Sequence, residues 1–154
     1  MKNAFFYDTS IGRIGIVENN NTITNVNIHK DIEFKNVEIK ETPLIKETYK
    51  QLQEYFEGNR NDFDLPLAPE GTEFQQRVWK ALQSIPYGKT MSYKEIAEKI
   101  GSPKAARAIG MANNKNPIFI IIPCHRVIGS NGKLVGYGGG LDLKERLLNI
   151  EKEN

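Results

Sequence analysis

The spacing of apolar residues changes along this chain of 154 residues, from the period of a β-strand to that of a helix. Segments 4–7, 14–17 and 22–28 are apolar or alternating and are separated by turns rich in Asn, Gly and Ser, which is typical of an antiparallel meander. Residues 43–57 follow a helical period that ends at Gly58, and helical spacing dominates the second half of the chain. The pattern therefore predicts an α/β (α+β) fold: a small meander with a helix, followed by a mostly helical domain.

A boundary between two lobes is indicated by residues 59–71, which contain two prolines and no regular period. We expect an N-terminal lobe over 1–66 that acts as a scaffold, because it holds no obvious chemical motif, and a C-terminal domain over 70–154. Residues 1–70 carry eight Lys and Arg against twelve Asp and Glu, a net charge of −4. Residues 71–154 carry thirteen against seven, a net charge of +6, so the second part is better suited to a polyanion.

A helix-turn-helix is predicted over residues 92–113. Ser92 begins a capping box, and the helix that follows it ends before Gly101. Ser102 is placed to cap a further helix, with Pro103 at its first position. Paired helices joined by a glycine turn are a common DNA-binding arrangement, and we therefore expect this segment to contact DNA.

The last of these helices carries little side-chain bulk around Lys104 and Arg107. Its small residues are Ala105, Ala106, Ala108, Gly110 and Ala112. A bare backbone of this kind can approach DNA closely, in which case Arg107 is the side chain that reaches furthest. The same composition also suits close packing against a neighbouring helix, and the sequence leaves both interpretations open.

The only cysteine, Cys124, follows an apolar run at 118–122 that predicts a short buried strand closed by Pro123. A lone cysteine beside such a run is most often a core residue. Here His125 and Arg126 come directly after it, and cationic neighbours favour the thiolate form. Since adjacent residues on a straight strand face opposite sides, a Cys–His pair requires the chain to bend or a water to bridge the two groups.

Several classes of protein are excluded by these counts. One cysteine cannot form an internal disulfide, and with only His29 and His125 it is a poor basis for a structural metal site, so we expect no metal. No apolar stretch has the length of a signal peptide core or a membrane span. We expect no membrane association and a cytoplasmic location, or a nuclear one if the source is eukaryotic.

Taken together, these residues resemble the O6-alkylguanine-DNA alkyltransferases, also called methylated-DNA-protein-cysteine methyltransferases. The resemblance spans about residues 72–151 as an ordered series of short motifs. They are Pro86-Tyr87-Gly88, Ser92-Tyr93, Pro103-Lys104-Ala105-Ala106-Arg107-Ala108, Asn116-Pro117, Pro123-Cys124-His125-Arg126-Val127, Gly136-Tyr137, Gly139-Gly140 and Lys144 with Leu147-Leu148. A Cys-His dipeptide alone would be a weak signal, but the whole series is specific.

The resemblance implies roles for four catalytic residues. Cys124 is the nucleophile and alkyl acceptor, and His125 removes its proton through a water. Glu151 stands where the family has a carboxylate that orients the histidine, although a solvated tail charge beside Glu153 is the alternative. Tyr93 resembles the tyrosine that donates a proton to N3 of the departing guanine.

The resemblance also implies a DNA-binding surface in which the damaged nucleotide is flipped out of the duplex. Arg107 is the finger that fills the gap, on a helix that enters the minor groove. The other implied substrate and DNA contacts are Lys104, Ala105, Ala106, Val127, Tyr137, Gly138 and Tyr93. Asn116 braces the active-site turn. Arg126 either polarises the thiolate or holds the two lobes together, and it is assigned the second, structural role. Gly138 departs from the family pattern, since many members carry serine or alanine at this position.

The implied function is direct reversal of DNA damage. A methyl or larger alkyl group moves from O6-alkylguanine to Cys124, once per molecule, without a cofactor; O4-alkylthymine is left open as a second substrate. The partner is double-stranded DNA, and a monomer is expected. Two other classes remain as alternatives: a non-catalytic helix-turn-helix DNA-binding protein, which has no use for Cys124, and a cysteine hydrolase, which would turn over an ester or amide.

Overall fold

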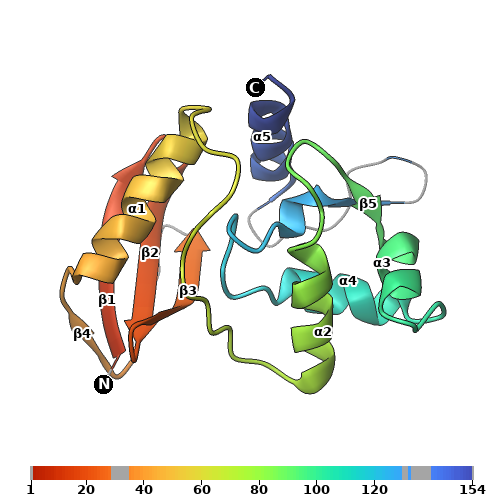
Figure 1. The fold of residues 1–154 in the computed structure, drawn as a ribbon, viewed down its shortest axis with the longest axis horizontal. Helices are drawn as coiled ribbons and strands as arrows, with labels where there is room; N and C mark the ends of the chain where they lie inside the picture. The colour runs from red at the N-terminus through yellow and green to blue at the C-terminus, as the bar shows by residue number, and fades with distance from the viewer. Residues whose placement is uncertain (1, 29–34, 130–131, 133–139, 154) are drawn as a thin grey trace. The chain divides into compact units, whose positions relative to one another are not determined.

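A computed structural model describes residues 2–28, 35–129, 132 and 140–153 (Figure 1). The chain divides into two compact units. The first comprises Met1–Glu70 with Pro117–Phe119, and the second comprises Gly71–Asn116 with Ile120–Asn154. Within the described ranges, no helix combines the length and apolar character that crossing a membrane requires.

The first unit contains a four-stranded sheet in the order β3-β2-β1-β4. Its strands are β1 (Lys2–Thr9), β2 (Gly12–Asn19), β3 (Thr22–Ile28) and β4 (Val37–Ile39). The first three pair antiparallel and confirm the predicted meander, whereas β4 pairs parallel with β1. The sequence did not indicate β4, because three residues are too few to display a period.

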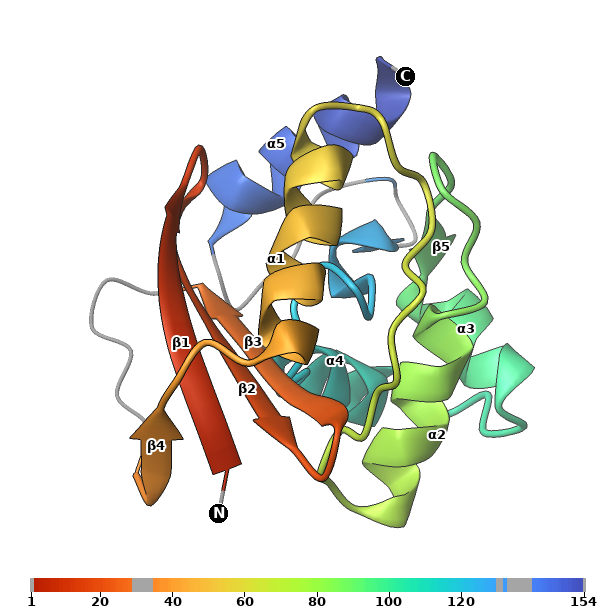
Figure 2. The same cartoon turned by 60° about the vertical axis from the view of Figure 1, so that its left-hand side comes forward.

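Helix α1 (Pro43–Phe56) packs against β1, β2 and β3, as Figure 2 shows. The Thr42 hydroxyl caps it by accepting a hydrogen bond from the Ile45 amide. Its buried face includes Ile45, Leu52 and Tyr55, which confirms the helical period read from the sequence. The sheet and this single helix thus form the core of the first unit.

The second unit is mostly helical. Its elements are α2 (Glu73–Leu82), β5 (Met91–Ser92), α3 (Tyr93–Lys99), α4 (Ala106–Asn114), a 3-10 turn η1 (Cys124–Arg126), β6 (Val127–Ile128) and α5 (Leu141–Lys152). Helices α3 and α4 pack together and confirm the helix-turn-helix. The indole of Trp79 on α2 is buried and donates to the Ala112 carbonyl of α4, which anchors that helix. The architecture confirms the α/β fold class.

The predicted start of the second DNA-binding helix is wrong: α4 begins at Ala106, not at Pro103. The Ser102 amide bonds to the Ala97 carbonyl, and the Gly101 amide bonds to the Glu98 carbonyl. With Gly101 at φ +78°, this pattern is a Schellman motif that ends α3. Ser102 therefore completes the preceding helix and does not cap the next one.

The strand predicted over 118–122 is also wrong. The residues are buried, as expected, but only Ile118 makes a strand-like bridge, to Val26 within the first unit. Ile120 has φ +73°, a left-handed conformation that interrupts an extended chain. Cys124 consequently lies on the 3-10 turn η1, and the short strand β6 follows it.

Candidate active site

Cys124 lies at the first position of η1 and is 1% exposed. Its amide donates to the Ile122 carbonyl at 2.8 Å, and the Arg126 amide donates to the Pro123 carbonyl at 3.0 Å. These bonds fold the chain back on itself where a strand was expected. The bend that a cysteine–histidine pair requires is therefore present at Cys124.

The imidazole of His125 is fully buried beside the carboxylate of Glu151, with Nε2 2.6 Å from Oε2. Burial lowers the pKa of His125, while the hydrogen bond and charge of Glu151 act in the opposite direction. The imidazole is thus neutral at pH 7. When Nε2 is held by the carboxylate, Nδ1 is the ring nitrogen that can accept a proton.

Glu151 is 3% exposed, so it is not a solvated tail charge. Its Oε1 accepts hydrogen bonds from the Gly88 amide at 3.0 Å and from Arg126 Nε at 2.9 Å. Its Oε2 also accepts from Arg126 Nη2, at 3.1 Å. A buried carboxylate with this many charged and neutral donors is held in one orientation, and it holds His125 in turn.

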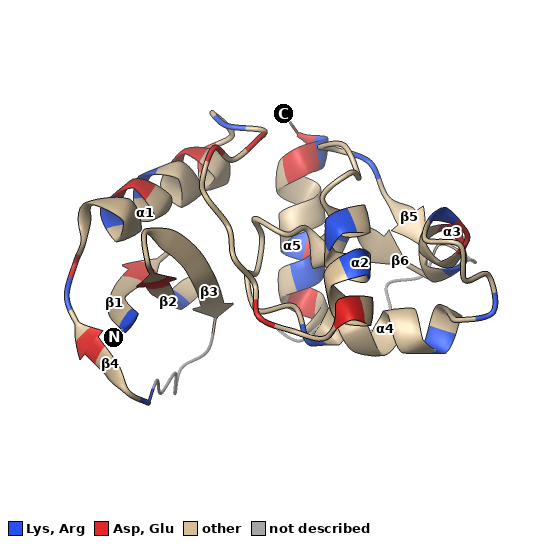
Figure 3. Ribbon diagram, turned by 60° about the horizontal axis from the view of Figure 1, so that its bottom comes forward, with Lys and Arg blue, Asp and Glu red and all other residues tan. Residues whose placement is uncertain are grey.

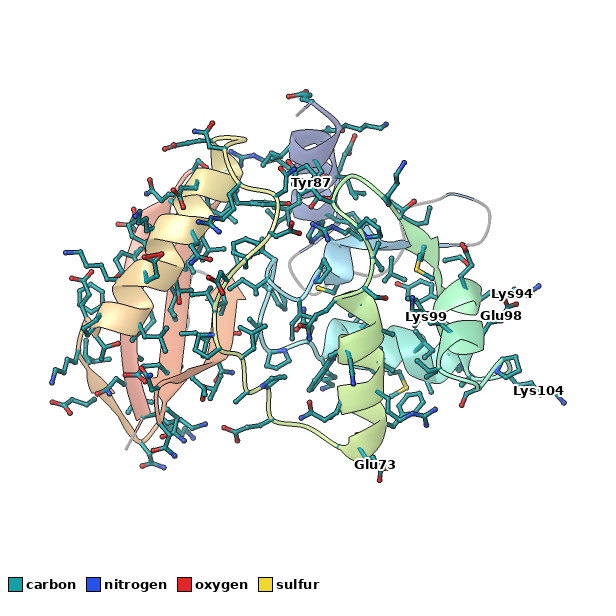
Figure 4. All side chains as sticks on the ribbon, viewed as in Figure 1. Glu73, Tyr87, Lys94, Glu98, Lys99 and Lys104 are labelled. Atoms are coloured by element: carbon teal, nitrogen blue, oxygen red, sulfur yellow. The ribbon has the colours of Figure 1, made fainter. Side chains whose placement is uncertain are left out.

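The guanidinium of Arg126 is committed to structural contacts within the second unit. Besides Glu151 it binds the carbonyl of Ile85, at 2.8 Å from Nη1. Its Cζ lies 5.7 Å from the ring centroid of Tyr87, which Figure 4 labels beside α5. These contacts support the structural assignment of Arg126, as the anchor of α5 to the loop that follows α2.

Two asparagines brace the turn. Asn116 donates from Nδ2 to the Ile122 carbonyl at 2.8 Å, just before the turn that bears Cys124. Asn113 on α4 donates from Nδ2 to the Cys124 carbonyl at 3.3 Å and is 1% exposed. Sequence reasoning missed Asn113, although it shares the buried face of α4 with Ile109 and Ala112 at helical spacing.

Lys144 is a second residue whose role was missed. Its side chain is fully buried, and Nζ donates to the carbonyl of Val127. Burial lowers the pKa of Lys144 to about 8, and the charge of Cys124 partly offsets this. Because electrostatic coupling is mutual, the ammonium also stabilises a Cys124 thiolate. A lysine within the buried face of α5, at helical spacing from Leu147 and Glu151, was the available signal.

Tyr93, the first residue of α3, is half-buried. Burial and the charge of Cys124 raise the pKa of Tyr93, whereas a side-chain hydrogen bond with Asn113 lowers it. The phenol is therefore protonated at neutral pH and close enough to Cys124 to sense its charge. Such a group can donate a proton in the same site as the thiol.

Cations lie exposed along the helix-turn-helix. Figure 3 shows Lys and Arg in blue on α2, α3 and near the start of α4, and Figure 4 shows Lys94 and Lys104 extending outward. Arg107 and Lys104 are exposed, and Ala105 and Ala106 are half-buried beside them. This surface can bind a polyanion.

The remaining predicted contacts fall in two places. Val127 is buried in β6, whose backbone pairs with β5 at Met91. Tyr137 and Gly138 lie outside the described residues. The second unit thus combines a cationic helix-turn-helix with a buried cysteine beside a histidine–carboxylate pair. These features define a class: DNA-binding proteins that carry a candidate cysteine nucleophile.

Comparison with known proteins narrows this class. Residues 73–153 match the family described as 6-O-methylguanine DNA methyltransferase, DNA binding domain, and residues 4–69 match its ribonuclease-like domain. The methylated-DNA–protein-cysteine methyltransferase of Methanosarcina acetivorans is 51% identical over 94% of this chain and 95% of its own. The constitutive enzyme of that name from Bacillus subtilis is 48% identical over 94% and 92%.

Among solved structures, Mycobacterium tuberculosis OGT in complex with DNA is 46% identical, with a TM-score of 0.93 over 98% of this chain and 93% of that chain. The chain therefore belongs to the 6-O-methylguanine DNA methyltransferase family. This confirms the resemblance identified from the sequence motifs.

Proposed function

We propose that this protein repairs DNA by moving the alkyl group of O6-alkylguanine onto Cys124, once per molecule. One observation carries the proposal: Cys124 opens a tight turn whose next residue, His125, is buried 2.6 Å from the Glu151 carboxylate. Family membership and relatives named for this reaction support it. A core cysteine would require neither a buried ion-pair network nor a neutral imidazole beside it.

The thiol is activated by the groups around it. His125 takes the thiol proton at Nδ1, through a water, while Glu151 holds Nε2 and stabilises the imidazolium that forms. Lys144 supplies a buried positive charge that favours the thiolate. Asn116 keeps the turn in the conformation that presents the sulfur.

The transfer is a displacement at carbon. The sulfur forms a bond to the alkyl carbon as the bond from that carbon to O6 breaks, and the electron pair passes to guanine. Tyr93 donates a proton to N3 of the departing base, which makes it a better leaving group. The thioether has no good leaving group, so Cys124 is not regenerated. The reaction balances without a metal or an organic cofactor, and it allows methyl or larger groups and O4-alkylthymine.

Access to the O6 atom requires the base to leave the stack. Arg107 extends from α4 into the duplex in place of the flipped base, and Lys104 contacts the phosphate backbone. Ala105 and Ala106 allow the helix to approach the minor groove closely. Val127, Tyr137 and Gly138 enclose the extruded base. The exposure of Arg107 and Lys104 supports this arrangement.

The two parts of the chain have different proposed roles. We assign the scaffold role to residues 1–66 and DNA binding and alkyl transfer to residues 70–154. The active-site contacts described above all lie within the second unit, which supports this division. A monomer acting on double-stranded DNA in the cytoplasm, or in a nucleus, completes the proposal.

Intact mass spectrometry after incubation with duplex DNA containing O6-methylguanine tests the proposal. We expect a gain of one methyl group per protein, mapped to Cys124, and none in the Cys124→Ser variant, which should still bind DNA. DNA binding without a mass gain would favour a non-catalytic helix-turn-helix protein. Repeated turnover of an ester or amide would favour a cysteine hydrolase.

A further inference from the structure

Asn113 links the nucleophile turn to the tyrosine. Its buried amide donates from Nδ2 to the Cys124 carbonyl at 3.3 Å, and its side chain is hydrogen-bonded to Tyr93. One turn earlier on α4, a Cβ built on Gly110 would lie 3.8 Å from Tyr93 Cε1, so the tyrosine ring packs against this part of the helix. Helix α4 thus contacts both the turn that bears Cys124, the proposed nucleophile, and Tyr93, the proposed proton donor.

The chemistry of these bonds sets their direction. A carbonyl oxygen only accepts, so the amide nitrogen of Asn113 must face Cys124. The amide Oδ1 has no hydrogen-bond partner among the described residues. The bond to Tyr93 is therefore also made by Nδ2, which can only donate, and the phenol oxygen accepts it. A hydrogen bond in this direction favours the phenolate and acts to lower the pKa of Tyr93, against the larger effect of burial.

We propose that Asn113 is a positioning residue that makes Tyr93 a proton donor, by occupying an acceptor site of the phenol so that its O–H is directed to the departing base. This inference rests on the proposed function and deepens it. An acceptor at this position, such as a carboxylate, would draw the phenol proton toward itself. The second N–H of Asn113, bound to the Cys124 carbonyl, fixes the donor relative to the nucleophile turn.

The step balances with this residue in place. As the C–O6 bond breaks, Tyr93 gives its proton to the guanine and becomes a phenolate, which the Asn113 N–H stabilises. The proton that His125 took from Cys124 then replaces the one that Tyr93 lost. The net change is thiol and O6-alkylguanine to thioether and guanine.

Two electrophiles separate proton donation from thiolate reactivity. O6-methylguanine in duplex DNA needs a proton on its leaving group, whereas iodoacetamide releases iodide, which needs none. We expect Asn113→Leu to slow methyl transfer at saturating DNA about tenfold. Its reaction with iodoacetamide should stay within about threefold of the wild type, because the groups that activate the thiol are unchanged. Asn113→Ala should behave in the same way and serves if the leucine variant does not fold.

A double-mutant cycle tests whether Asn113 acts through Tyr93. Tyr93→Phe should slow methyl transfer about a hundredfold. Adding Asn113→Leu to Tyr93→Phe should change the rate by less than about twofold, because the phenol that Asn113 orients is gone. Asn114→Leu, an exposed asparagine on the same helix, is the matched control and should leave both reactions unchanged.

Two outcomes would overturn the inference while leaving the proposed function standing. One is an equal loss of methyl transfer and iodoacetamide reaction in both Asn113 variants. The other is a loss in Tyr93→Phe that simply adds to that of Asn113→Leu. A Tyr93→Phe variant that transfers methyl at the wild-type rate would in addition remove the proton-donor role that the proposed function gives Tyr93. If the wild-type protein gains no methyl group at all, the proposed function and this inference fail together.

Discussion

Oε2 of Glu151 lies 2.6 Å from Nε2 of His125, and the same carboxylate also neutralises the guanidinium of Arg126. One buried acid on α5 thus orients the proposed base and holds the helix to the rest of its unit. The proposed catalysis and the stability of the unit therefore share one side chain, and a substitution that removes its charge should affect both.

Glu151→Gln keeps the shape of the side chain but leaves Arg126 buried without a counter-charge. We expect a loss of about 3–5 kcal/mol in the free energy of unfolding, the usual cost of breaking a buried ion pair. Methyl transfer should slow about 10–100-fold, because His125 loses the group that orients it. Urea unfolding and single-turnover kinetics measure the two effects.

Glu153→Gln is the matched control, since Glu153 is an exposed acid two residues further along. It should change neither quantity, because exposed charges contribute little to stability. A Glu151→Gln variant as stable as this control would show that the carboxylate network is not needed to hold α5.

The acid side of the pH profile should reflect His125, whose pKa is lowered from 6.5 by burial. The unfolded chain therefore binds a proton at a higher pH than the folded one, and stability falls as the pH drops from 6.5 toward the lower, folded value. The rate of methyl transfer should stay level down to pH 6.5 and fall only below it, because the neutral imidazole is the base. Unfolding and single-turnover rates between pH 4.5 and pH 8 measure both curves.

His125→Gln removes this titration and is the comparison for the stability curve. The difference in free energy of unfolding between the wild type and His125→Gln should become less favourable to the wild type below pH 6.5. A wild-type rate that already falls above pH 6.5 would mean that His125 is protonated in the working range and is not the proposed base.

Arg107 and Lys104 are both exposed on the helix-turn-helix, but the proposal gives them different tasks. Arg107→Ala should slow repair of duplex DNA even at saturating DNA, while the reaction with free O6-alkylguanine is spared, because the free base needs no flipping. Lys104→Ala should weaken binding of all duplexes and lower the salt dependence by about one counterion, with little change in the saturated rate.

Fluorescence anisotropy at several salt concentrations gives the affinities, and single-turnover assays with both substrates give the rates. Equal losses on duplex and free base in Arg107→Ala would contradict the finger role. If Arg107→Ala and Lys104→Ala had the same DNA affinity and the same saturated rate of repair, the two side chains would contribute only their positive charge.

The sequence predicted the elements whose signals are local. The capping box at Ser92 marks a helix start that the structure confirms. The prediction that Ser102 caps the following helix was wrong because a serine at this position can either end the preceding helix or cap the next one. The hydrogen bonds of the turn at Gly101 decide between the two. The strand expected before Cys124 failed for a similar reason, since burial of 118–122 does not supply a partner strand.

The sequence named those candidate site residues that belong to recognisable motifs. Cys124 and His125 lie on one turn, and the carboxylate of Glu151 lies 2.6 Å from His125. Asn113 and Lys144 were not assigned roles, because their tasks arise from what faces them across the fold. An asparagine on a helix of small residues and a lysine beside leucines reveal their partners only in three dimensions.

Lys144 provides a test of the electrostatics around the thiol. Burial lowers its pKa from 10.5 to about 8, so between these values the unfolded chain holds a proton that the folded chain has lost. The cost of burying the ammonium is therefore fully present below pH 8 and is relieved as the pH rises toward 10.5. Lys144→Met removes this titration, so the stability of the wild type relative to the variant should rise across that interval.

The same variant should react more slowly with iodoacetamide at neutral pH, because the thiolate of Cys124 loses a buried cation. Urea unfolding at pH steps from 7 to 10 and alkylation rates at the same steps provide both readouts. Lys152→Met, an exposed lysine on α5, should show neither effect. If the difference in free energy of unfolding between the wild type and Lys144→Met stays constant across these pH steps, Lys144 does not titrate within them. Its ammonium would then remain charged beside Cys124 throughout, and the slower alkylation alone would measure its support of the thiolate.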